Sequence, residues 1–251
     1  MINNQNMSKT GRISGLFFFL LIGLATFQAN AQDTGEDELG AWYMYFGMNR
    51  ISDDWSIHSE AQFRFYETTS NFNQLLLRTG ANYHISERAI ATLGYAYIWT
   101  DPTFEDEPLQ DAAFAGNSID EHRIFQQFLL YNQVGKFKFE HRYRLEQRFL
   151  SQEFSANTTV TDTQHRARYR LQITYPLGDT FFINWYDEVF INLQSPIFGQ
   201  NRLYLALGAK LNASTSIQAG FLKNSFTGAD FNRLQLGVFF NPDLRKKDVQ
   251  S

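Results

Sequence analysis

The stretch KFKFEHRYRLEQRF, from Lys136 to Phe149, decides the fold, because two unlike sets of residues alternate along its whole length. Alternation with a period of two is the signature of a β-strand whose two faces meet different surroundings. At about 3.3 Å per residue the stretch reaches roughly 45 Å, whereas strands usually have about five or six residues. One face carries Lys136, Lys138, Glu140, Arg142, Arg144, Glu146 and Arg148, and the other carries Phe137, Phe139, His141, Tyr143, Leu145, Gln147 and Phe149.

The same alternation recurs along the rest of the chain. Eleven candidate strands can be counted, but bacterial single-chain membrane barrels have even numbers of strands. Either one strand is therefore hidden or one candidate does not span the membrane, and the alternation of short and long loops indicates that 40–50 is the candidate that does not span. We therefore expect an all-β fold, a transmembrane antiparallel up-and-down barrel of about 10 to 12 strands. The candidate strands are 40–50, 55–66, 72–85, 89–100, 119–134, 136–150, 163–177, 180–193, 201–212, 215–226 and 231–241.

Short and long connections alternate between these strands, as in membrane barrels with tight periplasmic turns and longer outer loops. The long connections would therefore face outward from the cell. The short turns are 86–88, 135–136, 178–179 and 212–214, and the long connections are 101–118, 151–162 and 194–200.

The first 31 residues read as a secretory signal peptide. Lys9 and Arg12 precede an apolar run over 16–25, and Ala29 to Ala31 gives a small-x-small cleavage site before Gln32. A membrane anchor is the alternative, but ten apolar residues are too few for a helix to cross about 30 Å of hydrocarbon. We expect a signal peptide over 1–31, an outer-membrane barrel over 32–241 and a polar C-terminal tail over 242–251.

Composition excludes several kinds of site. The chain has no cysteine, so it can form neither disulfides nor thiolate metal sites. Its five histidines lack zinc-binding spacing, and a net charge of −4 gives no nucleic-acid footprint. We therefore expect no metal, no cofactor and no nucleic-acid partner. Aromatic residues reach 16% although mean hydropathy is −0.36, which indicates sharply separated faces.

Alternation alone does not distinguish a membrane barrel from a soluble lipocalin-like barrel, in which the apolar side faces inward. Three features favour the membrane barrel: long strands, a face dense in arginine and glutamate that suits a narrow lumen, and an aromatic-rich face that suits lipid. The expected location is the bacterial outer membrane, with its lipid and the barrel-assembly machinery as partners.

Four motifs resemble the domain-of-unknown-function 2490 family: EHRIFQQF at 121–128, EHRYRLEQRF at 140–149, HRARYR at 165–170 and NRLYLALG at 201–208. The resemblance covers nearly the whole chain after residue 31. It implies a small outer-membrane barrel and no particular activity. The chain departs from barrels that end on an aromatic residue read by the assembly machinery, because a polar tail follows Phe240.

The densest group of charges is expected inside the barrel, and three functions are considered for the protein. The charges could plug a narrow interior with ion pairs, since barrels of about eight strands are just filled by side chains. They could also form a narrow anion-preferring channel, because arginine forks match anionic oxygens. The charge belt comprises Arg142, Arg144, Arg148, Arg166, Arg168, Arg170, Glu140, Glu146, Glu60, Arg64, Arg78, Glu188, Arg202 and Arg233.

The third possibility is an outer-membrane lipid acyl hydrolase. Neighbours on a strand, such as His58 and Ser59, face opposite sides and cannot act together, and neither His84 with Ser86 nor any other pair completes a triad. We therefore expect a non-enzymatic barrel with no catalytic residues. Asp187 falls on the apolar face, which predicts either a place near an interface or a bulge between Tyr186 and Glu188.

Overall fold

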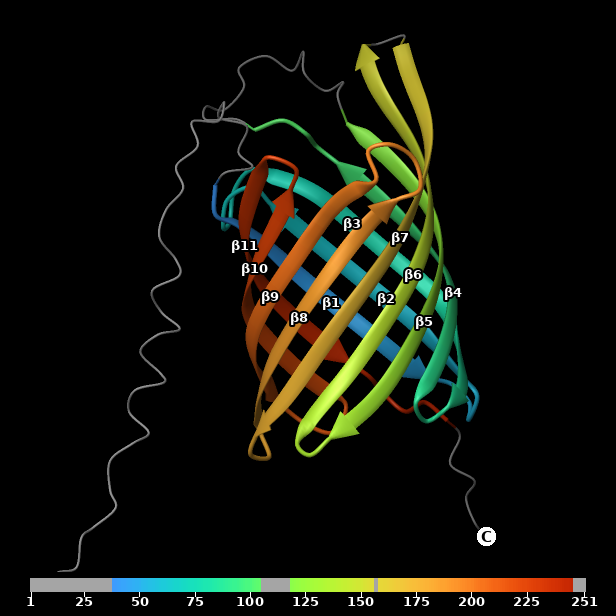
Figure 1. Ribbon diagram of the computed structural model, residues 1–251, viewed down its shortest axis with the longest axis vertical. Helices are drawn as coiled ribbons and strands as arrows, with labels where there is room; N and C mark the ends of the chain where they lie inside the picture. Colours follow the sequence, from blue (N-terminus) through green and yellow to red (C-terminus); the bar gives the residue numbers. More distant parts are fainter. Residues whose placement is uncertain (1–37, 105–117, 156–157, 246–251) are drawn as a thin grey trace, which may run out of the picture. The chain divides into compact units, whose positions relative to one another are not determined.

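Eleven β-strands make up the described part of the chain, which comprises residues 38–104, 118–155 and 158–245 of a computed structural model (Figure 1). The expected signal peptide lies outside these residues. No helix of the described residues is long and apolar enough to cross a membrane. The strands are β1 (Gly40–Arg50), β2 (Trp55–Phe65), β3 (Phe72–Ser86), β4 (Ala89–Thr100), β5 (Ile119–Val134), β6 (Phe137–Ser155), β7 (Thr158–Leu177), β8 (Phe181–Asn192), β9 (Phe198–Lys210), β10 (Thr215–Phe226) and β11 (Ala229–Phe240).

The sheet closes into a barrel, which confirms the predicted fold class. Each strand pairs antiparallel with its neighbours in the sequence, and β1 pairs in parallel with β11, from Gly40 opposite Arg233 to Gly47 opposite Phe240. The expectation of an even strand number, with 40–50 left over, is wrong. A parallel closing pair lets an odd number of strands satisfy their backbone groups without leaving an edge.

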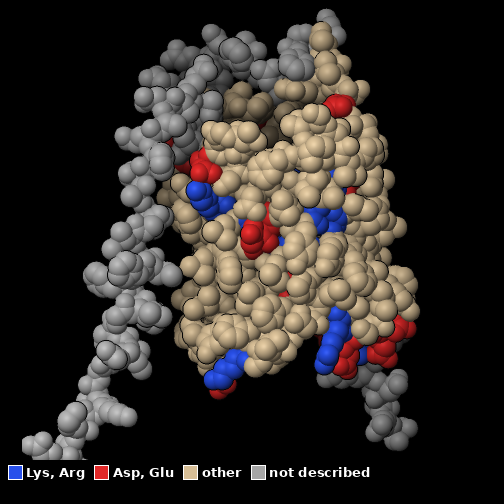
Figure 2. All heavy atoms as spheres, viewed as in Figure 1, with Lys and Arg blue, Asp and Glu red and all other residues tan. Residues whose placement is uncertain are grey.

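Side chains sort by charge between the two faces of the barrel. The outward-facing Leu93 and Leu205 are 61% and 58% exposed, whereas the inward-facing Glu146 and Arg144 are 0% and 3% exposed. Uncharged residues cover most of the face shown in Figure 2, and charged residues gather at its lower edge and in a few islands above it. The soluble lipocalin-like arrangement, with apolar side chains inside, is therefore the reverse of what the barrel has.

The connections fall into two groups, one at each end of the barrel. The turn end carries 51–54, 87–88, 135–136, 178–180 and 211–214, and the loop end carries the connections that follow β2, β4, β6, β8 and β10. Gly135 and Gly178 lie in the turns after β5 and β7 with φ of 58° and 94°, the left-handed backbone that glycine adopts without steric cost.

The expected long connection over 151–162 is wrong, because β6 continues to Ser155 and β7 begins at Thr158. Gln152 pairs with Val160 and Ser151 with Thr161, so these strands project beyond their neighbours at the loop end (Figure 1). The segment 158–163 is exposed throughout. Strands bathed in water on both faces need no apolar alternation, which is why the pattern missed them.

The start of the C-terminal tail continues the β1–β11 seam at the turn end. The amide of Met48 donates to the side-chain carbonyl of Asn241 at 3.0 Å. The amide of Arg50 donates to the carbonyl of Pro242 at 3.0 Å, and that of Leu244 donates to the carbonyl of Arg50 at 2.8 Å. These bonds satisfy backbone groups in the last residues of β1, which extend past the end of β11.

Charged groups on the tail reinforce this attachment at the surface. Arg245 contacts Asp243 at 2.5 Å and Asp53 at 2.6 Å. The hydrogen bond from Arg245 lowers the pKa of Asp243 to about 2, so this carboxylate stays ionised across ordinary pH. Both partners are exposed, so the pair contributes little to stability in salt.

The parallel seam predicts a specific crosslink. Tyr45 and Val238 are register partners across β1 and β11, and paired strands bring Cα atoms within the range that a disulfide bridges. The double variant Tyr45→Cys/Val238→Cys should therefore form an intramolecular disulfide under mild oxidation, detected by altered gel mobility. Tyr45→Cys combined with Phe221→Cys on β10 should not. Equal crosslinking of both pairs, or of neither, would contradict the seam.

Candidate functional site

A cavity of about 760 Å³ lies inside the barrel and is the candidate site. Its lining includes Asn224 and Phe226 near the loop end and Phe239 and Asn241 near the turn end. At about 30 Å³ per water molecule, the space holds on the order of 25 waters. The cavity therefore has room for a hydrated small solute as well as for the side chains that line it.

Strand β4 contributes no lining residue because other side chains cover its inner face. Phe125 is fully buried against Gly94, where an added Cβ would lie 2.3 Å from the ring. Leu76, Ala96 and Ile98 form a small apolar cluster beside it. The inner face of β4 is therefore largely apolar, and the charges lie on the other strands.

All fourteen residues of the predicted charge belt lie on the inner face of the barrel. Thirteen of them line the cavity, and Glu146 is fully buried behind them. The belt also contains Glu121 and Arg123 of β5, which the sequence analysis left out. Glu121, Arg123 and Gln127 alternate on one face of the strand, and this period of two was the signal that could have placed them in the belt. The inward-facing Phe125 lies between them and interrupts the row of polar residues.

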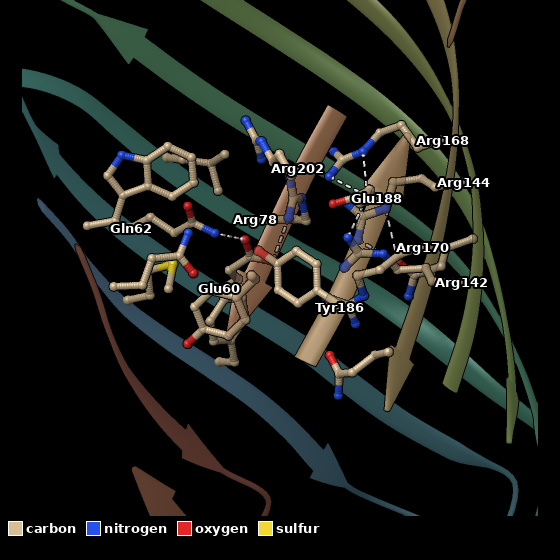
Figure 3. A pocket seen from close by; sticks show the side chains of 18 of the residues that line it. Glu60, Gln62, Arg78, Arg142, Arg144, Arg168, Arg170, Tyr186, Glu188 and Arg202 are labelled. Atoms are coloured by element: carbon tan, nitrogen blue, oxygen red, sulfur yellow. Dashed lines mark hydrogen bonds and ion pairs between the residues drawn. The ribbon is translucent and has the colours of Figure 1, made fainter. Parts of the chain in front are cut away.

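Glu146 and Glu188 hold the largest group of ion pairs. Glu146 contacts Arg166 at 2.6 Å and Arg168 at 2.7 Å, with Arg123 and Arg144 at 3.5 and 3.6 Å. Glu188 contacts Arg142 at 2.7 Å and Arg168 at 2.8 Å, and Figure 3 shows these arginines converging on it. The adjacent strands β5, β6, β7 and β8 supply this group through registers such as Glu146 opposite Arg166.

Three smaller groups surround it. Glu60 accepts from Arg78 at 2.5 Å and contacts His58 at 3.1 Å. Glu121 accepts from Arg148 through two nitrogens at 2.8 and 2.9 Å and also contacts Arg123 at 2.6 Å. Glu140 pairs with Arg170. These bonds explain how so many charges are tolerated in a confined interior.

Positive charge nevertheless exceeds negative charge inside the barrel. Eleven arginines line the cavity, and five glutamates face them, which leaves an excess of six positive charges among the described residues. The arginines are Arg64, Arg78, Arg123, Arg142, Arg144, Arg148, Arg166, Arg168, Arg170, Arg202 and Arg233, and the glutamates are Glu60, Glu121, Glu140, Glu146 and Glu188.

The structure joins one serine and one histidine that the sequence analysis did not pair. Ser56 is buried, and its hydroxyl lies 2.8 Å from Nε2 of His84. The other ring nitrogen, Nδ1, lies 3.0 Å from Arg50, and a guanidinium can only donate. Nε2 therefore carries the proton and donates to Ser56, so this histidine does not act as a base toward that hydroxyl.

The remaining histidines are scattered. His58 faces Glu60 inside the barrel, whereas His122, His141 and His165 face outward. None of the described histidines and carboxylates forms a group of three or more that could hold a metal ion.

Asp187 lies outward without the expected bulge. The register is regular from Tyr186 to Glu188, and the shift in this strand pair lies between Phe190 and Ile191. Asn201 on β9 donates to the Asp187 carboxylate at 2.6 Å. This bond supplies one polar partner to a charge on an otherwise apolar face.

A comparison with protein-family models finds a match over most of the described barrel. A family model described as "Protein of unknown function (DUF2490)" matches residues 39–235, which run from the start of β1 into β11. No curated protein matches the chain. A solved structure titled as a porin refined at 1.8 Å resolution is similar over 79% of this chain and 60% of the porin chain, with 17% identity and a TM-score of 0.35. The chain thus spans about 60% of the length of that porin.

Glu146 should matter more for stability than any other glutamate of the belt. Glu146→Gln leaves several arginines close together and buried without their common carboxylate, so it should lower the free energy of unfolding by about 3 to 5 kcal/mol. Glu140→Gln is the matched control, because Glu140 is 19% exposed at its side chain and forms one ion pair, with Arg170, among the described residues. It should cost about 1 to 2 kcal/mol. Urea unfolding in detergent micelles measures both, and equal losses would contradict this ranking.

Proposed function

We propose that this chain, a member of the DUF2490 family of proteins of unknown function, is a non-enzymatic outer-membrane barrel whose lumen admits and passes small anions. The observation that carries the proposal is the cavity of about 760 Å³ with six more arginines than glutamates around it. Arginine forks bind anionic oxygens, and a charged passage concentrates counter-ions.

The outward surface supports a place in the outer membrane. Strand β2 has 11 residues, which at about 3.3 Å each and a tilt near 40° cross roughly 25 to 28 Å, the height of the apolar band of membrane barrels. Aromatic pairs lie near both ends of this band. Trp55 and Tyr83 are 5.0 Å apart at the turn end, and Phe72 and Trp99 are 5.8 Å apart at the loop end. Such girdles are typical of the two lipid–water interfaces.

Two other functions fit less well. An acyl hydrolase needs an activated nucleophile, and the Ser56–His84 pair has the opposite hydrogen-bond polarity. A purely structural envelope barrel would have an interior filled by side chains, which a cavity holding on the order of 25 waters does not favour.

The proposed location predicts how the protein behaves in extraction. With its apolar residues outward, it should sediment with the outer-membrane fraction of a sucrose gradient and require detergent for extraction. Purified protein that stays monodisperse in buffer without detergent, or that is found in the periplasmic fraction, would contradict the location.

The proposed activity predicts ion selectivity that shifts with lumen charge. In planar bilayers under a KCl gradient, the protein should give discrete conductance steps. Their reversal potential should lie closer to the equilibrium potential of chloride than to that of potassium. Arg170→Gln and Glu140→Gln remove opposite charges from one ion pair. Arg170→Gln should therefore move the reversal potential toward potassium, and Glu140→Gln should move it further toward chloride. Silence across many insertions, or shifts of the same sign in both variants, would overturn the proposed activity.

A further inference from the structure

Two arginines of the lumen converge on the same tryptophan. Trp42 of β1 is 7% exposed and packs against Tyr204, Ala206 and Leu222. The guanidinium carbon of Arg64, on β2, lies 3.8 Å from the centre of its ring, and that of Arg202, on β9, lies 4.9 Å from it. The two guanidinium carbons are therefore within about 9 Å of each other.

Neither arginine has a carboxylate within ion-pair distance among the residues that the structure describes. Arg64 donates to the amide oxygens of Gln62 and Gln74, which carry no charge. Arg202 has no hydrogen-bond partner in the described chain, and its Nε is buried without an acceptor. Its guanidinium contacts the rings of Trp42 and Phe190 instead. This pair of arginines therefore contributes to the excess positive charge of the lumen without a direct counter-charge.

A guanidinium presents five N–H donors in a fixed fork. Arg64 uses three donations on its two glutamines, and Arg202 uses none. Both residues line the cavity, so the donors that these bonds leave unused are available to a solute there. Two cations at this separation, neither with a carboxylate in ion-pair contact, repel each other unless a negative group stands between them.

We propose that Arg64 and Arg202 form a clamp beside Trp42 for a small dianionic oxyanion of the phosphate class. The inference rests on the proposed function in that such a solute reaches the clamp through the lumen. A tetrahedral oxyanion directs oxygens to several sides, so one such ion can accept from both guanidinium forks at once. Two negative charges neutralise both arginines, whereas chloride offers neither the charge nor the directed oxygens.

Trp42 provides a direct readout of occupancy. The other tryptophans, Trp55, Trp99 and Trp185, alternate onto the outward face, and Trp55 and Trp185 are 45% and 46% exposed. Titration of the purified full chain in detergent with inorganic phosphate should therefore change tryptophan emission in a saturable way. Trp42→Phe should abolish the change. Potassium chloride and acetate at matched ionic strength should leave the emission unchanged.

Variants of the clamp test its composition. Arg64→Gln and Arg202→Gln should each weaken phosphate binding at least about tenfold, because each removes charge-assisted hydrogen bonds. Arg202→Lys keeps the charge but loses the fork and should also weaken binding. Lys223→Gln is the matched control, since it removes a cation from the exposed Lys223–Asp230 pair outside the lumen, and it should bind phosphate normally. Retained β-sheet circular dichroism shows that each variant is folded.

The outcomes separate this inference from the proposed function. Saturable phosphate binding that needs both arginines supports the clamp even if bilayers show no conductance, in which case only the channel activity fails. Anion-selective conductance without a saturable phosphate response overturns the clamp alone. A response that acetate or chloride reproduces, or that Arg64→Gln and Arg202→Gln leave unchanged, also overturns it.

Discussion

Closure of the backbone hydrogen-bond ladder is the constraint on which the rest of this structure depends. A sheet surrounded by apolar medium has no water to satisfy an open edge, so every strand needs two neighbours. Here the last gap is closed by a parallel pair, β1 with β11, and the residues after Phe240 extend the pairing of β1 toward the turn end. Once the ladder is closed, the two-residue period of each strand assigns every side chain to the lumen or to the outside.

Confinement then determines the chemistry of the interior. A buried arginine is costly without a partner, and the strand registers place glutamates opposite arginines on β6, β7 and β8. Glu146 is fully buried and shared among several arginines, while Arg202 rests on aromatic rings with no carboxylate bonded to it. The interior is therefore a rigid ion-pair network on one side and an unneutralised positive region on the other. This asymmetry underlies the proposed preference of the lumen for anions.

The sequence was most informative where the two faces of a strand differ. The stretch 136–149, together with the other strands that repeat its alternation, was enough to predict the barrel, the inward direction of the arginines and most of the belt. Prediction failed where the surroundings of the two faces are alike: the projecting part of β6 and β7 meets water on both sides, so its polar residues resembled a loop. The predicted strand number was wrong because an even number was assumed from other barrels. Nothing in the sequence of 40–50 shows that this strand pairs in parallel with β11.

Side-chain contacts between strands were also beyond the reach of sequence. The Ser56–His84 bond and the approach of Arg64 and Arg202 to Trp42 join residues on different strands. A period of two gives the face on which each of these residues lies, but their distances depend on barrel stagger and on the rotamers that neighbours allow. For the same reason, the apolar cover of Phe125 over β4 could not be recognised from β5 alone.

The odd number of strands has a topological consequence for the two flanks of the barrel. Eleven crossings place Gly40 and Phe240 at opposite ends, because β1 and β11 run in the same direction. In a barrel with an even count, both flanks would emerge on one side. In the proposed membrane location, a reporter fused ahead of Gly40 and another fused behind the tail would therefore lie on opposite sides of the membrane.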